Sequence, residues 1–468
     1  MKTRTLFLIS TPLEAHPDNF KILPEALEIK SVHAPREDRY VFEYDDLTEE
    51  LKKVLDGLKG EVSARWTSGA VYEGQNPFAA RTPAGLSVVV EKSEDTGDLC
   101  PLINTIAPTS ACIDAAFTPL PSGSIFYTPT PVPPQLSFLP LLSPEQLTSL
   151  TTASYLDLRL SPVTKTLTIN AFFPLPPASS AHTIIRPSTH PVEVGVLGLE
   201  KPMEESGLAL GGLLHQVGHD KKLEPVMFGF ANRHHLFPGT FSVDTIKPTG
   251  LHPKLQLKLK AKRGEMKPPA EDCTLNAFFM LPRQVFVDKY QISPSNPQLL
   301  RELGIRGINV SGEADLEQPD WASVKWGSTL LAELDPSKES IEVPLHLRYL
   351  QPEEGRDKME IQVAAPAVFW ACGGESEEAG RLKQSPFERR GLGWEGYFGE
   401  MGEGVVYHHL ALAGESAYTE IEVPVMDLAY GEYVKYGTAV VVMGGFLWVL
   451  MKTFLAGGSK KEGEKKKQ

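Results

Sequence analysis

One uncharged stretch near the C-terminus limits what this 468-residue chain can be. Residues 436–451 have the sequence YGTAVVVMGGFLWVLM, and residues 453–455 continue the apolar run past Lys452. A lysine at a helix end can place its ammonium among lipid headgroups while its stem stays in hydrocarbon. About 20 apolar residues span a bilayer core, so residues 436–455 predict a transmembrane helix. The alternative is a helix buried in a protein core, because the strictly apolar part is short.

The residues after this stretch are strongly basic. Residues 452–468 contain six lysines and two glutamates, a net charge of +4, whereas the other flank carries Lys435 beside Glu432. Positive flanks stay in the cytosol, so we expect a cytosolic tail at residues 456–468 and a luminal N-terminal region. Lys465 and Lys466 stand fourth and third from the end, which resembles the dilysine signal that returns membrane proteins to the endoplasmic reticulum. An ordinary solvated basic tail is the alternative.

The rest of the chain is acidic. Subtracting the tail's +4 from the chain's net charge of −13 leaves −17 on residues 1–451. Affinity for nucleic acid comes mainly from lysine and arginine on phosphates, so we expect no nucleic-acid partner. Thirty-nine prolines and 39 glycines favour short strands and turns over long helices.

Alternation of apolar and polar residues predicts strands in this acidic part. Residues 6–9 are apolar but too few for a secretory signal, so we expect a first strand there and no cleaved signal peptide. Residues 47–58 have apolar side chains at helical spacing and predict one helix. Alternation, typical of antiparallel sheets with one face in solvent, marks residues 156–160, 255–259, 341–349 and 421–425.

These patterns predict a mainly β fold with two β-sandwich-like luminal domains and one C-terminal transmembrane helix. The motif Asn-Ala-Phe-Phe at residues 170–173 recurs at residues 276–279, which favours two units with one strand plan over chance. The uncharged residues 115–144 contain eight prolines and predict a surface loop. We expect an N-terminal β-rich domain at 1–207, a glycine-rich break at 208–214, a second β domain at 225–428, the helix at 436–455 and the tail at 456–468.

Histidine pairs are the only candidates for chemistry along the chain. His215 and His219 have the spacing of two metal ligands on a helix, but their segment is glycine-rich and no third ligand accompanies them. We therefore expect a surface loop there, and likewise at His234–His235 and His408–His409. The chain has no Asp-x-Asp, phosphate loop or Gly-x-Ser-x-Gly motif. The sequence predicts no catalytic set, cofactor or metal, although glycosidase carboxylates carry no short motif.

Two covalent modifications are expected in a lumen. Asn309-Val310-Ser311 is the only N-glycosylation sequon, and Gly304 and Gly307 before it predict an exposed turn. The spacing of the four cysteines fits no zinc pattern. Two disulfides in an oxidising lumen or four buried thiols are the open alternatives for Cys100, Cys112, Cys273 and Cys372.

An ordered set of residues between positions 251 and 372 carries a resemblance to a known family. Besides Cys273 and Cys372, its members are Leu251, His252, Leu281, Pro282, Asp288, Tyr290, Pro319, Pro344, His346, Arg348, Tyr349 and Pro366. The set resembles PIG-X, the accessory subunit of glycosylphosphatidylinositol (GPI) mannosyltransferase I. Residues 36–39, the helix ending near residue 58 and Trp66 resemble the longer fungal form, the protease-B-nonderepressible proteins.

The resemblance implies a non-catalytic subunit of the endoplasmic reticulum membrane. Such a subunit binds and stabilises a polytopic catalytic subunit of the PIG-M type, which adds the first mannose to the GPI precursor. Because Cys273 and Cys372 bracket the PIG-X-like block, two separate sandwiches would pair Cys273 with Cys372 and Cys100 with Cys112. A general luminal chaperone for membrane or vacuolar clients and a membrane-tethered glycan hydrolase are the competing functions.

Overall fold

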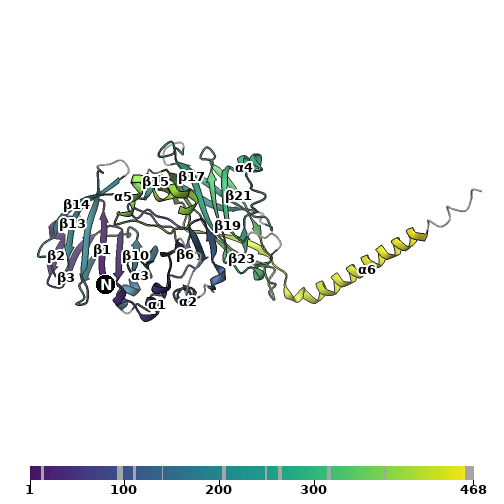
Figure 1. The fold of residues 1–468 in the computed structure, drawn as a ribbon, viewed down its shortest axis with the longest axis horizontal. Helices are drawn as coiled ribbons and strands as arrows, with labels where there is room; N and C mark the ends of the chain where they lie inside the picture. Colours follow the sequence, from purple (N-terminus) through teal and green to yellow (C-terminus); the bar gives the residue numbers. More distant parts are fainter. Residues whose placement is uncertain are drawn as a thin grey trace, which may run out of the picture.

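The computed structural model describes residues 1–11, 15–91, 99–108, 112–139, 141–202, 207–247, 250–261, 266–313, 318–373 and 376–458. Within these residues the chain forms two large sheets, three small ones and one long C-terminal helix (Figure 1). The mainly β fold with one C-terminal apolar helix is therefore confirmed.

The first large sheet has 11 strands and occupies the left half of the ectodomain in Figure 1. The apolar residues 6–9 lie in β1, which is internal and runs parallel to β12 and antiparallel to β4. In spatial order the strands are β14 (Glu224–Ala231), β13 (Gly207–Gln216), β12 (Val192–Glu200), β1 (Lys2–Ile9), β4 (Arg36–Phe42), β10 (Thr166–Phe173), β9 (Tyr155–Ser161), β5 (Val62–Thr67), β6 (Gly85–Glu91), β8 (Gly123–Thr128) and β7 (Thr118–Leu120).

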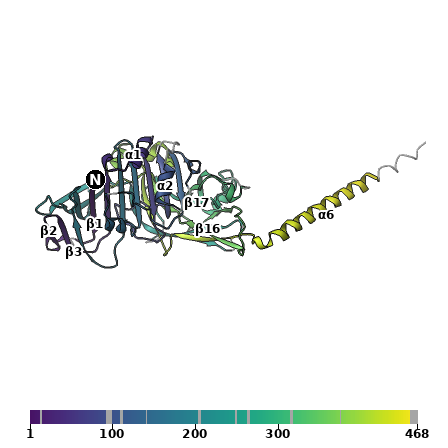
Figure 2. The same cartoon turned by 90° about the horizontal axis from the view of Figure 1, so that it is seen from below.

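Helices and a small sheet cover parts of this first sheet. The helix predicted at residues 47–58 is α1 (Glu49–Gly57), which buries Leu51 and Leu55 in one core with the strands. At the end remote from the C-terminal helix, a three-stranded sheet packs on β1 and β12 (Figures 1 and 2). The other elements here are α2 (Leu99–Ile106), α3 (Pro144–Leu150), β11 (Ser180–Ile185), β3 (Ala26–Val32) and β2 (Phe20–Leu23).

The second large sheet has eight strands and lies nearer the C-terminal helix. The predicted strand at residues 255–259 is β16, and its three leucines are 0–8% exposed. The strands of the second sheet in spatial order are β19 (Ile305–Gly312), β20 (Gly327–Leu334), β17 (Thr274–Pro282), β24 (Ala367–Cys372), β25 (Val406–Leu412), β15 (His234–Ile246), β16 (Lys254–Ala261) and β21 (Ser340–Pro344). Two short ribbons share its core, namely β18 (Val285–Phe286) with β22 (His346–Leu347) and β23 (Lys358–Ala364) with β26 (Tyr418–Pro424).

A continuous core joins the two large sheets. Phe278, Phe369 and Tyr407 from the second sheet belong to the same buried cluster as Leu86 and Phe126 from the first. The two copies of Asn-Ala-Phe-Phe lie in β10 and β17, and both strands are internal to their sheets. The division of the ectodomain into separate domains at 1–207 and 225–428 stays a prediction.

Strands occupy two stretches that were not predicted to form them: residues 208–214, expected as a break between domains, and part of residues 115–144, expected as a surface loop. Residues 208–214 form part of β13, because their glycines lie between leucines that pair with β12 and β14. The proline-rich residues 115–144 contain β7 and β8, and Ile125, Phe126 and Tyr127 are 0–2% exposed. The lack of charge in residues 115–144 therefore reflects the buried strands β7 and β8 and not an exposed linker.

The C-terminal helix α6 (Gly431–Gly458) projects away from the ectodomain (Figure 1). Within Leu428–Ala456 an 18-residue window has a mean hydropathy of 1.9, and none of that window is buried in the protein. These properties fit a single-pass membrane protein. Lys465 and Lys466 lie outside the described residues.

Candidate functional site

The residues that carried the family resemblance gather mainly at one edge of the second sheet. We call His252, Phe286, Asp288, His346 and Arg348 the Arg348 edge. Strand β18 pairs with β22, and the backbone N–H of Leu347 donates to the carbonyl of Leu251 at 3.0 Å. The His346 ring meets the His252 ring at 4.7 Å between centroids and the Phe286 ring at 5.4 Å.

Arg348 holds this edge together. Its side chain is 2% exposed, and its guanidinium lies 4.4 Å from the centre of the Phe286 ring. The guanidinium donates to the carbonyls of Arg283 at 3.0 Å, Gln318 at 2.7 Å and Glu313 at 3.4 Å. Because the planar guanidinium carries five donors in a rigid fork, one side chain holds carbonyls of two separate connections, the one after β17 and the one after β19. Its role here is to order backbone and not to perform chemistry.

Asp288 and its neighbours form the exposed part of the edge. The Asp288 carboxylate accepts from the backbone N–H groups of Tyr290 at 2.8 Å and Gln291 at 3.1 Å. Burial, and secondarily His252, lowers the pKa of His346, although Asp288 opposes the shift from 3.8 Å. Tyr290 and Tyr349 are 71% and 65% exposed. An ordered loop that presents tyrosines to solvent suits protein contact, because tyrosine is enriched at interfaces.

The remaining motif residues support this edge or lie elsewhere. Leu281 is fully buried in β17, and Pro282 ends that strand beside the edge. Pro319 precedes the short helix η5 (Asp320–Ala322), and Pro344 ends β21 opposite Lys254. Pro366 stands apart, between β23 and β24.

A groove lies between Arg283, whose carbonyl accepts from Arg348, and Glu353. Trp321, Leu350 and Ile361 are among the other residues that line it. The carbonyl of Glu353 accepts from the backbone N–H of Leu428 at 3.1 Å, in the short helix η7 (Leu428–Tyr430) that leads into α6. The groove therefore extends from a residue that Arg348 holds to a residue that contacts the segment before α6.

The cysteines and the sequon lie in other parts of the fold. Cys273 is bonded to Cys372 across the adjacent strands β17 and β24, and Cys100 to Cys112 beside α2. Asn309 is exposed on β19, the edge strand of the second sheet, so the prediction of a turn there was wrong. The glycines before it end α4 (Pro297–Leu303) and start the strand.

A buried polar junction between the two sheets was not predicted from the sequence. The segment that links β24 to β25, including α5 (Ser376–Lys383) and η6 (Glu395–Glu403), inserts Arg389 against the first sheet. The Arg389 guanidinium meets Glu37 of β4 and Asp157 of β9, the latter at 3.1 Å. Arg65 of β5 lies 3.3 Å from the other oxygen of Asp157. Asp157 was expected on a solvent face, but the inserted segment covers that face.

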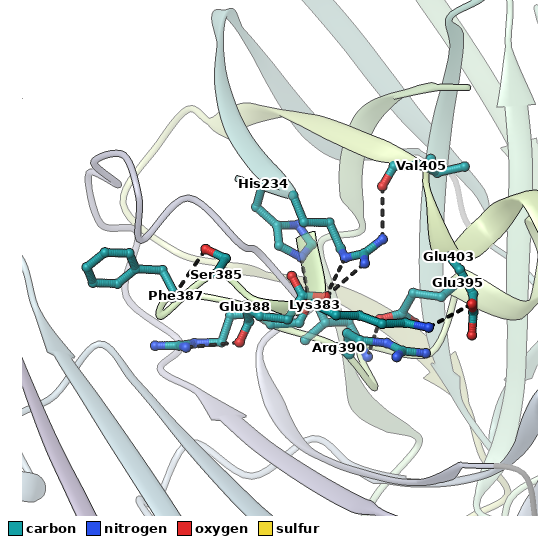
Figure 3. Close-up of polar contacts among 12 residues, drawn as sticks. His234, Lys383, Ser385, Phe387, Glu388, Arg390, Glu395, Glu403 and Val405 are labelled. Carbon is teal, nitrogen blue, oxygen red and sulfur yellow. Dashed lines mark hydrogen bonds and ion pairs between the residues drawn. The ribbon is translucent and has the colours of Figure 1, made fainter. Parts of the chain in front are cut away.

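Two histidines, His234 and His409, form the second part of this junction, and Figure 3 shows His234. His234 Nε2 lies 2.9 Å from the Arg389 carbonyl, and His234 Nδ1 lies 2.9 Å from His409 Nε2. Since a carbonyl can only accept, we assign the proton to His234 Nε2 and a donated bond from His409 Nε2 to His234 Nδ1. Burial lowers the pKa of both rings well below the usual value. The pair is therefore neutral.

The surface-loop prediction failed for most of the histidines. His215, His234 and His409 are 0–2% exposed inside strands, whereas the ring of His219 is exposed as expected. The His235 and His408 rings stack at 5.1 Å between the parallel strands β15 and β25. A usable hint was present in the sequence, because each pair stands in an apolar, strand-like stretch.

The carboxylates of Glu37 and Asp157 are buried against arginines. Glu37 and Asp157 are 1% and 9% exposed, and both face arginines and not a cleft. A glycoside hydrolase needs two carboxyl groups on either side of a bound sugar. Among the described residues, no group of three or more His, Cys, Asp or Glu side chains is placed to hold a metal.

Comparison with known proteins assigns the chain to a family. The family model described as PIG-X / PBN1 matches residues 248–454, which include the Arg348 edge and most of α6. Protein pbn1 of Neurospora crassa is 34% identical over 97% of this chain and 95% of its own length. Protein pbn1 of Emericella nidulans is 31% identical over 98% and 97%, and Protein PBN1 of Saccharomyces cerevisiae is 26% identical over 61% and 63%. The chain therefore belongs to the PIG-X/PBN1 family, which acts in GPI-anchor biosynthesis.

Proposed function

We propose that this chain is a non-catalytic subunit that binds and stabilises the catalytic subunit of GPI mannosyltransferase I in the endoplasmic reticulum. The family match over residues 248–454 carries the proposal, because it joins the Arg348 edge to α6 in one unit. A polytopic partner in the same bilayer can contact α6 and the ordered loops beside it together. Tyr290 supplies an exposed aromatic contact at that edge.

The middle of α6 suits close contact with another helix. Gly437 and Gly444 stand seven residues apart and so share one side of the helix, with Gly445 next to them. A Cβ added at any of the three meets no atom of this chain within 4 Å. Transmembrane helices approach closely where small residues line the contact. A larger side chain at Gly444 therefore spares the chain's own fold and obstructs a partner helix.

The proposed subunit has a luminal ectodomain and a cytosolic tail. The lysines after residue 451 support this orientation, and two disulfides suit an oxidising lumen. Lys465 and Lys466 support retrieval to the endoplasmic reticulum. Protease added to sealed microsomes should remove the tail and spare the ectodomain, and a protected tail would reverse this topology.

Affinity purification from mild detergent followed by mass spectrometry tests the partner. The full-length chain should bring down one mannosyltransferase in near-equal amount, and the Gly444→Leu variant should bring down much less. Val442→Leu is the matched control, because Val442 is exposed on the other side of α6. A broad set of clients in small amounts would support the general chaperone instead, and absence of a mannosyltransferase would contradict the proposal.

A further inference from the structure

Hydrogen bonds fix the short segment between the ectodomain and α6. The backbone N–H of Val425 donates to the carbonyl of Asp357 at 3.0 Å, and that of Leu428 donates to Glu353. The Asp427 carboxylate accepts from the backbone N–H groups of Gly355 at 3.0 Å and Ala429 at 2.9 Å. Helix α6 begins at Gly431. The loop at residues 353–357 is therefore held at a fixed height above the membrane span.

That height matches the headgroup layer. Residues 431–435 form the first part of α6 before the apolar run that starts at Tyr436. Five helical residues rise about 7.5 Å. Each headgroup layer of a bilayer is about 5–8 Å thick, the difference between a hydrocarbon core of about 30 Å and a total of about 40–45 Å. The ectodomain surface around Glu353 thus lies at the outer boundary of the lipid.

Large apolar side chains are exposed on this surface. We call Trp321, Tyr349, Met426, Leu428 and Tyr430 the aromatic platform, and their exposed fractions are 51%, 65%, 39%, 51% and 62%. The first two adjoin each other, because the backbone N–H of Asp320 donates to the Tyr349 carbonyl at 3.0 Å. Trp321 also lines one groove with Glu353, which bonds to Leu428. Glu353 stands four positions after Tyr349, so their Cα atoms are at most about 14 Å apart.

Three ion pairs lie beside the platform. Arg283 meets Asp320 at 2.9 Å, Arg356 meets Glu353 at 2.8 Å, and Lys358 meets Glu422 at 3.2 Å. Glu360 and Glu420 line the same groove, so this surface combines exposed aromatic side chains with a negative charge. Tryptophan and tyrosine are enriched where membrane proteins meet lipid headgroups, because their rings are apolar with one polar tip.

We propose that the aromatic platform rests in the headgroup layer, so that the ectodomain docks on the bilayer through a second contact besides α6. A rigid link and a lipid contact together fix the tilt of the ectodomain, since one helix alone leaves rotation free. The Arg348 edge is then held in one orientation toward any neighbour in the membrane. This inference requires α6 to span the bilayer but does not require the mannosyltransferase partner.

Tryptophan fluorescence can test this contact in the full-length chain. Trp66, Trp326, Trp370 and Trp394 are only 0–8% exposed, and Trp448 lies in α6. In the Trp448→Phe variant, Trp321 is thus the only exposed tryptophan among the described residues. The protein is reconstituted alone into phosphatidylcholine vesicles, with or without a nitroxide on the choline headgroup.

The nitroxide on the headgroup should quench the fluorescence of Trp321 in the Trp448→Phe variant, so the emission of this variant should be lower with the nitroxide than without it. The same variant with Trp321→Phe should lose no emission to the nitroxide, because its tryptophans are buried. Quenching of the unmodified chain by lipid brominated in the acyl chains verifies insertion through Trp448. Equal emission of the Trp448→Phe variant with and without nitroxide would overturn the proposal, and would leave this surface to a protein partner.

Discussion

Arg389 gives the sharpest test of how the two sheets are held together. The Arg389→Met substitution keeps the length of the side chain and removes its charge from a site that is 11% exposed. Breaking a buried ion pair by removing one partner costs about 3–5 kcal/mol of folding free energy. Each carboxylate keeps a second arginine, Arg4 at 3.8 Å from Glu37 and Arg65 at 3.3 Å from Asp157. We therefore expect the lower end, about 3 kcal/mol.

Urea unfolding of the full-length chain in detergent, followed by tryptophan fluorescence, measures this loss. The midpoint should fall at an unchanged slope, because the native surface area stays the same. Arg159→Met is the matched control on the same sheet: its pair with Glu61 is 27–36% exposed, and an exposed pair contributes about 0–1 kcal/mol. Adding Glu37→Gln to Arg389→Met should recover part of the loss, since the uncompensated charge is then gone.

A small effect would refute the reasoning. If Arg389→Met and Arg159→Met shift the midpoint equally, the inserted segment is held by its apolar side chains and not by its charge. Failure of Glu37→Gln to recover any stability would show the same. Both outcomes would leave the shared apolar core as the main link between the sheets.

Three further measurements test other parts of the fold. Burial, and secondarily His235, lowers the pKa of His408 to about 4 from 6.5, so the unfolded chain binds more protons between these values. His408 alone should lower the stability by about 2 kcal/mol between pH 7 and pH 5, and the buried His234 and His409 act in the same direction. An equal urea midpoint at both pH values would contradict this. Cys273→Ser should lower the amount of folded protein more than Cys100→Ser does. The Cys273–Cys372 bond closes a loop of 99 residues and the Cys100–Cys112 bond a loop of 12, so they stabilise the fold by about 4.7 and about 3 kcal/mol through the entropy of the unfolded chain. Equal yields on quantitative blots would count against this prediction. Asn309→Gln should abolish a mobility shift on endoglycosidase treatment, because Asn309 is exposed; an unchanged shift would place glycan elsewhere.

Local patterns were enough for the parts of the fold whose neighbours are close in sequence. The apolar run at residues 436–455 is contained in α6, and the helix predicted at residues 47–58 is α1. Alternation at residues 255–259 and 421–425 predicted β16 and β26. For α1, β16 and β26 the side-chain period alone decides which face is buried.

The buried junction depends on partners too distant for such patterns. Arg389 stands 352 residues after Glu37, and in the sequence Phe387 to Arg390 resembles a solvated charged loop. Asp157 alternates with leucines as a solvent-facing residue would, yet the second sheet's connection covers it. Charged residues are almost never fully buried unless they are paired, and no local rule predicts where the partner comes from. The available hint was a run of four consecutive charged residues, Arg36 to Arg39, inside one strand.

The junction also argues against treating the family-matched residues as an independent body. Strand β15 is internal to the second sheet, between β25 and β16, yet it ends at Ile246, before the match begins at residue 248. Arg389 lies inside the match and both of its carboxylates lie outside it. The first sheet therefore completes the burial and the charge balance of the half that carries α6. Contacts at Asp427 then join that half to the membrane helix, so loss of the junction should disturb any contact made at the bilayer.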